Sequence, residues 1–150
     1  MKDNVIAKNS SAFRDFAILE SFECGIELKG SEVKSIREGN VNLKDSFARI
    51  EDEEVLLYNT HITPYEKGSY FNVEAKRIRR LLLHKNEIRR ILGKVNQRGL
   101  ALVPLKFYFK KSFVKVELGL VKGKKLYDKR RAIKERELDI EMKRALRQRR

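Results

Sequence analysis

A chain of 150 residues with 41% apolar side chains is long enough for one packed domain and an extension. Its 35 Lys and Arg residues against 21 Asp and Glu residues give a net charge of +14, which favours a polyanionic partner such as a nucleic acid. The single cysteine, Cys24, excludes an internal disulfide, and no apolar run is long enough to span a membrane, so we expect a cytoplasmic protein without a membrane partner.

Signatures of catalysis and of metal or cofactor binding are missing from the sequence. His61 and His84 have no Cys or His at ligand spacing, so we expect no metal site. Cys24 sits in an alternating apolar pattern, which favours a small core residue over a nucleophile. Because no phosphate loop or hydrolase motif is present either, we expect neither a cofactor nor an enzymatic activity.

The N-terminal third of the chain is predicted to contain a flexible segment, a strand and a helix. Residues 1–12 are small and polar, and we expect them to be flexible until bound. Apolar residues alternate from 16 to 28, which is typical of a half-buried strand, or of two strands interrupted near Gly25. Glu20 breaks the inward, apolar face of this pattern. Ser31 as cap, Glu32 at the positive end of the helix dipole and Gly39 as stop predict a short helix over 32–38. Val33 and Ile36 are expected to be its buried residues.

The rest of the body alternates short strand patterns with one amphipathic helix. The expected elements are strands over 43–50, 55–62, 101–109 and 114–120, and a helix over 85–98. The first two strands flank the acidic turn 51–54 at the spacing of a β-hairpin. In the last strand, one face is expected to carry Val114, Val116, Leu118 and Leu120. In the third of these strands, the odd positions from Ala101 to Phe109 are expected to share one buried face, and Pro104 predicts an edge or a bulge. Short strands with helices at their junctions predict a mainly β (α+β) fold, a closed or partly closed oligonucleotide-binding-type barrel of about six strands. A β-sandwich is the alternative.

The segment 63–79 is predicted to be a loop in which aromatic residues alternate with cations. Its aromatic residues are Tyr65, Tyr70 and Phe71. Such a loop suits base stacking combined with phosphate neutralisation. Packing of the same rings beneath the loop is an equally good interpretation, and the sequence does not choose between them.

The C-terminal segment concentrates the positive charge. Residues 122–150 hold thirteen Lys and Arg residues and five acids, 13 − 5 = +8, and few apolar residues. A solvated charged helix is the ordinary interpretation of such a run. Because the excess charge is one-sided and the apolar residues are too sparse for a core, we expect an appendage that becomes ordered against a polyanion.

Several runs resemble the tmRNA-binding protein family (small protein B, or SsrA-binding protein). They cover nearly the whole chain, and GSEVKS, LLLHKNEI and GKKLYDKR are the most specific. The matching runs are 22–39, 61–72, 79–95, 102–130 and 133–137. The resemblance implies an oligonucleotide-binding barrel over 13–122, after a flexible segment 1–12, and a tail over 123–150 that is disordered when free and helical when bound.

The resemblance also implies a function without covalent chemistry. The family binds the tRNA-like domain of tmRNA and delivers it to stalled ribosomes for trans-translation, the rescue pathway that tags the incomplete peptide. Its tail occupies the decoding centre of the small ribosomal subunit, contacting ribosomal RNA, and the empty mRNA channel. Elongation factor Tu, bound to alanyl-tmRNA, is an indirect partner.

Matching positions assign candidate site residues to this sequence. The resemblance places RNA contact on Asn9, Glu23, Leu82 and Lys115, and we add Lys34 and Arg79 from the matching runs. The decoding-centre residues of the tail are Tyr127, Asp128, Lys129, Arg130, Ile133, Lys134, Glu135 and Arg136. Lys115 would neutralise a phosphate, whereas Glu23 would accept hydrogen bonds from base or ribose donors. Without the resemblance, Glu23 would be an ordinary surface carboxylate.

Some positions depart from the family pattern. Arg14 stands where members commonly have His, Ser10 and Ser11 replace basic residues, and Ala75 replaces a Pro. These differences bear on the N-terminal contacts and on the 63–79 loop. The rival interpretations are a generic basic RNA-binding protein of the ribosome and a barrel for single-stranded nucleic acid, but neither explains the acids that punctuate the tail.

Overall fold

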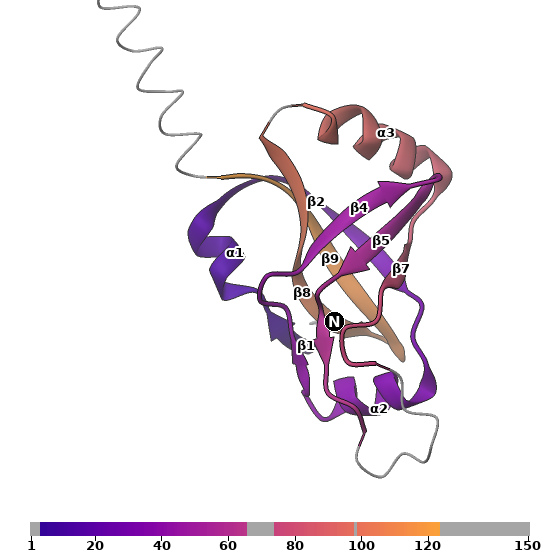
Figure 1. Cartoon of the computed structure of the whole chain (residues 1–150). Helices are drawn as coiled ribbons and strands as arrows, with labels where there is room; N and C mark the ends of the chain where they lie inside the picture. Colours follow the sequence, from indigo (N-terminus) through magenta and orange to yellow (C-terminus); the bar gives the residue numbers. More distant parts are fainter. Residues whose placement is uncertain (1–3, 66–73, 98, 124–150) are drawn as a thin grey trace, which may run out of the picture.

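Six antiparallel strands close into a ring that forms the body of the protein (Figure 1). The computed structural model describes residues 4–65, 74–97 and 99–123. The ring strands are β2 (Phe16–Ile26), β4 (Phe47–Glu51), β5 (Glu54–Tyr58), β7 (Arg79–Leu82), β8 (Leu100–Lys110) and β9 (Phe113–Gly123). Their order is β8-β4-β5-β7-β2-β9, and pairing of β9 with β8 closes the ring. The predicted closed barrel of about six strands is confirmed, in place of the sandwich.

Two strand pairings lie outside the ring. In the first, β1 (Asn4–Lys8) pairs with the edge of β8 that also contacts β4, while the other edge of β8 pairs with β9. β3 (Val41–Asn42) and β6 (His61–Ile62) form a separate two-stranded sheet. The predicted strands 43–50 and 55–62 are therefore each shorter than expected, since part of each region belongs to this small sheet or its turns.

A β-hairpin without glycine joins β4 to β5. Asp52 and Glu53 at its tip both have positive φ, 48° and 63°. Two successive left-handed residues are the signature of the primed turn whose twist matches that of the flanking strands. The predicted hairpin around the acidic turn is confirmed.

The main core fills the barrel interior. It contains side chains from all six ring strands, and Ile36, Ile88 and Ile91 add the contributions of two helices. On β9 the alternating residues Val114, Val116, Leu118 and Leu120 all face this core, as predicted. Burial of apolar surface of this kind contributes about 25 cal/mol per Å² and is the main force that holds the barrel closed.

A second, smaller core lies on the outer face of β8 and β9, under α1 (Ser10–Asp15). It consists of Ala12, Val103, Leu105 and Val121. The prediction that the odd positions 101–109 share one face is wrong, because the ladder register shifts between Pro104 and Lys106. Because of the bulge, the odd positions Val103 and Leu105 belong to the outer core, whereas Phe107 belongs to the inner one. The bulge predicted from Pro104 itself is confirmed.

Helices α2 (Gly30–Arg37) and α3 (Lys85–Val95) lie at opposite ends of the barrel (Figure 1). α2 buries Ile36 as predicted, but its other fully packed positions are Glu32 and Ser35, while Val33 is half-buried. Gly39 follows α2 with φ of 79°, the left-handed stop that the sequence predicted. α3 begins at the predicted residue and ends at Val95, three residues earlier than expected.

The N-terminal segment differs from the expected flexible one. Asn4–Lys8 form β1 on the free edge of β8, and Ser10 begins a helix. Asn9 is buried and its backbone N–H donates to the carbonyl of Leu105 at 2.8 Å. Open ladder positions on β8 give this polar segment backbone partners that a composition argument cannot foresee. The described body therefore starts at Asn4 rather than at residue 13.

Only the ends of the predicted 63–79 loop are described. Its first residues are held by α2, since Ser35 Oγ donates to the carbonyl of Thr63 at 2.5 Å. The ammonium of Lys34 lies 5.5 Å from the centre of the Tyr65 ring. Tyr70 and Phe71 lie outside the described residues, as does the whole tail from residue 124, so the predictions for those segments stay predictions.

Candidate nucleic-acid interface

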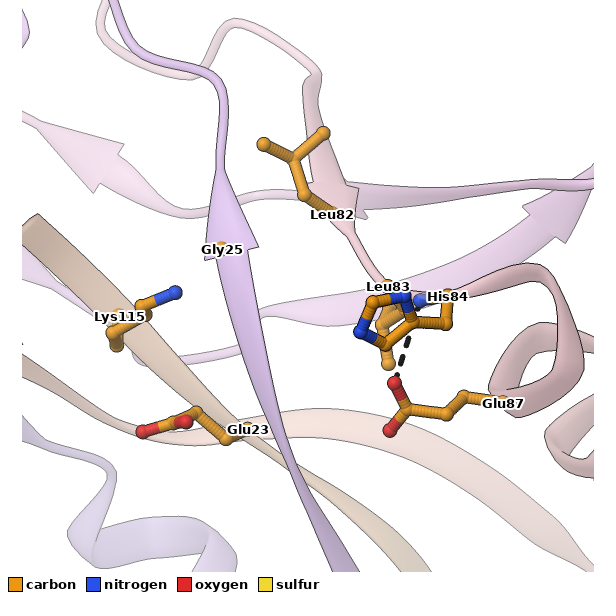
Figure 2. Close-up of a pocket in the computed structure, with 7 residues that line it drawn as sticks. All are labelled: Glu23, Gly25, Leu82, Leu83, His84, Glu87 and Lys115. Atoms are coloured by element: carbon orange, nitrogen blue, oxygen red, sulfur yellow. Dashed lines mark hydrogen bonds between the residues drawn. The ribbon is translucent and has the colours of Figure 1, made fainter.

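An open pocket of about 440 Å³ lies where β2, β7, β9 and the start of α3 meet (Figure 2). Three of the predicted contact residues, Glu23, Leu82 and Lys115, line it although they are far apart in the sequence. The other lining residues are Gly25, Leu83, His84 and Glu87. The barrel therefore brings together half of the predicted body contacts in one place.

Strand register explains why these residues meet. Gly25 is paired with Leu82 on one side and with Lys115 on the other, so the three residues form one row across three strands. A side chain at Gly25 would fill the middle of this row, since its Cβ would lie 3.2 Å from the Cβ of Leu82. The sequence interpretation treated Gly25 only as an interruption in a strand pattern. Its glycine character keeps the floor of the pocket open.

Glu23 is held at the edge of the pocket by two donors from β8. The Tyr108 hydroxyl donates to Oε1 of Glu23 at 2.6 Å, and Nζ of Lys110 lies 3.3 Å from both carboxylate oxygens. The hydrogen bond from Tyr108, and then Lys110 and Lys115, lower the pKa of Glu23 below its ordinary value, although burial raises it. Glu23 is thus an ionised acceptor at neutral pH, and its side chain is 41% exposed.

The opposite wall of the pocket comes from the start of α3. The backbone N–H of His84, the N-cap residue, donates to Oε1 of Glu87 at 3.3 Å (Figure 2). Leu82 beside it leaves 44% of its surface exposed and gives the pocket an apolar contact surface. The pocket therefore combines two carboxylates, one ammonium group and an apolar patch, rather than a uniform positive charge.

α3 is fixed to the barrel by a carboxylate that the sequence analysis had marked as a break in the inward face. Glu20 on β2 forms ion pairs with both Arg90 and Lys94 of α3. Arg90 also lies over the Phe22 ring, 5.8 Å from its centre. These contacts attach α3 to β2 and keep the start of the helix beside the pocket.

Arg79 was predicted as an RNA contact, and the structure corrects this. Its side chain is completely buried, and its guanidinium lies 2.6 Å from Oε2 of Glu32. It also donates to the carbonyls of Thr60 (2.7 Å) and Ala75 (3.0 Å). A guanidinium with this set of internal partners ties β7 to α2 and to the last part of the 63–79 loop, and it is closed to a ligand.

Asn9 and Lys34 are not brought to the pocket either. Nδ2 of Asn9 donates to the carbonyl of Pro104 at 2.9 Å, and Oδ1 accepts from Ala12 N at 3.2 Å as the N-cap of α1. Its largely buried side chain therefore has an internal role as the cap of α1, and RNA contact by Asn9 stays a prediction. Lys34 is exposed on α2, beside Tyr65 and not among the residues that line the pocket.

A second hollow, of about 330 Å³, lies beside α1. It is lined by Lys8, Asn9, Ser10, Ser11, Arg14, Asn42 and Lys44. Arg14 is also paired with Asp15 at 3.2 Å, where both side chains are largely exposed. Three departures from the family pattern, at Ser10, Ser11 and Arg14, thus gather in one polar hollow that shares no lining residue with the Glu23 pocket.

Cys24 is a core residue, as predicted. Its side chain is fully buried, and burial raises the pKa of the thiol to about 12, so the reactive thiolate is not populated at neutral pH. Within the described residues, no group of three or more His, Cys, Asp and Glu side chains is arranged to hold a metal ion. In the same part of the chain, no helix has the length and apolar character needed to cross a membrane.

A closed antiparallel barrel with a mixed-charge surface pocket and a large positive net charge defines a small, basic β-barrel protein suited to binding nucleic acid. The sequence pattern of the family described as SmpB protein matches residues 6–148. The chain therefore belongs to the SmpB protein family.

Known relatives are similar over almost their whole length. The SsrA-binding protein of Carboxydothermus hydrogenoformans is 58% identical over 98% of this chain and 99% of its own. That of Geobacillus kaustophilus is 53% identical over 97% of this chain and 94% of its own. A chain in the solved structure described as "tmRNA-SmpB: a journey to the center of the bacterial ribosome" is 56% identical, with a TM-score of 0.64 over 82% of this chain and 83% of that one.

Proposed function

We propose that this protein binds the tRNA-like domain of tmRNA and delivers it to stalled ribosomes for trans-translation. The observation that carries the proposal is the pocket that gathers Glu23, Leu82 and Lys115 from three strands. These are residues to which the family resemblance assigns RNA contact. The near full-length similarity to SsrA-binding proteins, and to a chain of a tmRNA-SmpB structure, supports the same partner.

The chemistry of the pocket suits a folded RNA better than a uniform duplex. Lys115 supplies a cation for a phosphate, and the exposed side chain of Leu82 supplies an apolar contact for the face of a base. Ionised Glu23 accepts hydrogen bonds from amino, imino or 2′-hydroxyl donors, which are accessible where RNA bases are unstacked. In this proposal the barrel works in the manner of an oligonucleotide-binding fold.

The tail is proposed to serve the ribosome. The predicted tail is 123–150, and since Gly123 ends β9, the part after it would become helical in the decoding centre and mRNA channel of the small subunit. Its contacts would be Tyr127 and the charged residues after it. The family match extends to residue 148, so this segment is included in the similarity. Elongation factor Tu would take part only indirectly, through alanyl-tmRNA. The protein would perform no covalent chemistry and would work in the cytoplasm, where ribosomes translate.

A binding titration tests the proposal. Full-length protein and a chain that ends at Gly123, the last residue of β9, are titrated with the tRNA-like domain of tmRNA, an ordinary tRNA and an unrelated hairpin at low and high salt. Preference of both chains for the tRNA-like domain at high salt supports specificity in the barrel. Equal, salt-sensitive binding to all three RNAs would instead identify a generic basic binder, because counterion release depends on the number of phosphate contacts.

A charge-reversal pair separates the two outcomes further. Glu23→Lys should weaken binding to the tRNA-like domain roughly tenfold despite the added positive charge, because a specific acceptor is lost. Glu51→Lys is the matched control, since Glu51 also accepts a hydrogen bond from a tyrosine, Tyr58, but lies on β4 outside the pocket. If both variants bind equally well or more tightly than the parent, Glu23 has no role in recognition.

A further inference from the structure

Two rows of polar side chains cross the outer face of β2, β9 and β8 beside the pocket. In one row, Glu117 on β9 is paired with Glu23 on one side and with Lys106 on the other. In the adjacent row, Lys115 is paired with Gly25 and with Tyr108. The Tyr108 hydroxyl reaches across β9 from one row to the other to donate to Glu23 at 2.6 Å.

Tyr108 is a rigid donor, whereas the second partner of Glu23 is not. The Tyr108 residue is only 5% exposed, so packing on β8 fixes the ring and with it the position of the hydroxyl. The side chain of Lys110 is 48% exposed and its ammonium lies at a longer 3.3 Å from the carboxylate. The buried ring of Tyr108 loses no conformational freedom when its hydroxyl makes this bond. A long, exposed lysine side chain would lose rotamer freedom in making the same bond.

We propose that Tyr108 is a positioning residue for RNA recognition, whose hydroxyl fixes the orientation of the Glu23 carboxylate so that its remaining lone pairs accept hydrogen bonds from the RNA. A carboxylate offers about four acceptor sites, and Tyr108 occupies one of them. Fixing a flexible glutamate before the RNA arrives removes part of the ordering cost of binding. This inference rests on the proposed function, because it assigns a role within the same pocket.

The charge of Glu23 gives the inference a second, independent readout. The Tyr108 hydrogen bond is the largest cause of the lowered pKa of Glu23. The other charged or titratable groups that face it from β8, β9 and the start of α3 are Lys110, Lys115, Glu117, His84 and Glu87. Without the Tyr108 hydroxyl, the pKa of Glu23 rises towards its ordinary value. As the pH is lowered, Glu23 is then protonated earlier, so RNA binding should be lost at a higher pH than in the parental protein.

The test compares two tyrosine-to-phenylalanine variants of the full-length chain. Tyr108→Phe keeps the buried ring and removes only the hydroxyl. Tyr58→Phe removes a hydroxyl that donates to Glu51 at 2.9 Å outside the pocket, and serves as the matched control. Affinity for the tRNA-like domain should fall about fivefold to tenfold in Tyr108→Phe, within the range of one typical hydrogen bond, and stay at the parental value in Tyr58→Phe.

The pH profile and a Glu23→Gln background distinguish positioning from general damage. Tyr108→Phe should move the acid limb of RNA binding to higher pH, and it should have no further effect when Glu23→Gln is already present. An equal loss in both backgrounds, or an unchanged pH profile, would overturn the proposal. Failure of the parental protein to prefer the tRNA-like domain would instead overturn the proposed function itself. Unfolding curves of all variants show whether any loss of RNA affinity results from loss of folded protein.

Discussion

Replacing Arg79 by Met tests the internal role that the structure gives this residue. Arg79 has no exposed surface and donates to Glu32 and to two backbone carbonyls, those of Thr60 and Ala75. Its neighbour on the same strand, Arg80, makes ion pairs with Glu27 and Glu54, but all three side chains are between 41% and 51% exposed. The same substitution at two adjacent positions therefore compares a buried with an exposed arginine.

The expected losses of unfolding free energy differ severalfold between Arg79→Met and Arg80→Met. Removing one partner of a buried ion pair costs about 3–5 kcal/mol of unfolding free energy. In the variant, Glu32 keeps the guanidinium of Arg77 at 2.6 Å and the backbone N–H of Lys29 at 2.8 Å. We therefore expect the loss of unfolding free energy in Arg79→Met to be near the lower end of this range, about 3 kcal/mol. Arg80→Met removes only exposed pairs, which are screened by water and salt and contribute about 0–1 kcal/mol.

Urea unfolding followed by circular dichroism at pH 7 measures both values. The variants should keep the slope of the parental transition, so that a shift in midpoint reports stability alone. Below the unfolding transition, Arg79→Met should retain the parental affinity for the tRNA-like domain, because its side chain is closed to a ligand. Equal losses of stability at the two positions, or a selective loss of RNA affinity in folded Arg79→Met, would refute the reasoning.

Three further changes test the buried carboxylate and two glycines. Burial raises the pKa of Glu32, but hydrogen bonds from arginines and a backbone N–H lower it more, to below the ordinary 4.5. The stabilisation by ionised Glu32 is therefore present above pH 4.5 and is lost as the pH falls through the lower, folded-state pKa, so the stability gap between parent and Glu32→Gln should narrow in acid urea titrations. Gly119→Ala should cost about 1–3 kcal/mol in thermal unfolding, because its Cβ would lie 2.8 Å from Cδ1 of buried Leu105. Gly93→Ala, inside α3 with nothing within 4 Å, should instead stabilise by about 0.5–1 kcal/mol, and a loss there would contradict the open space seen around it.

Local sequence signals correctly predicted those structural features that depend mainly on residues close together in the chain. The alternation on β9, the left-handed stop at Gly39 and the bulge at Pro104 are all such cases. The prediction for the face of β8 was wrong although its bulge was foreseen. Propensity locates a bulge, but only the pairing register shows which residues it sends outward.

Burial of charged residues was the main error, and it has a physical cause. Glu32 was expected only to favour the start of a helix, and Arg79 to contact RNA, but the two form a buried pair 47 positions apart. Sequence patterns treat each charge as exposed, because a buried charge is tolerable only with a partner that is distant in the chain. The internal hydrogen bond of Asn9 was not foreseen for a similar reason, since its partner Pro104 is 95 positions away.

The sequence by itself determined the class of the protein. Its charge, its alternating strand patterns and its family motifs identified a barrel with a basic tail, and they singled out Glu23, Leu82 and Lys115. Tertiary structure alone decided that these side chains share a pocket, that Gly25 forms its floor and that Tyr108 holds Glu23. The reason is that closure of the ring sets the register of β9 against both β2 and β8, and that register is a property of the whole barrel rather than of any one segment.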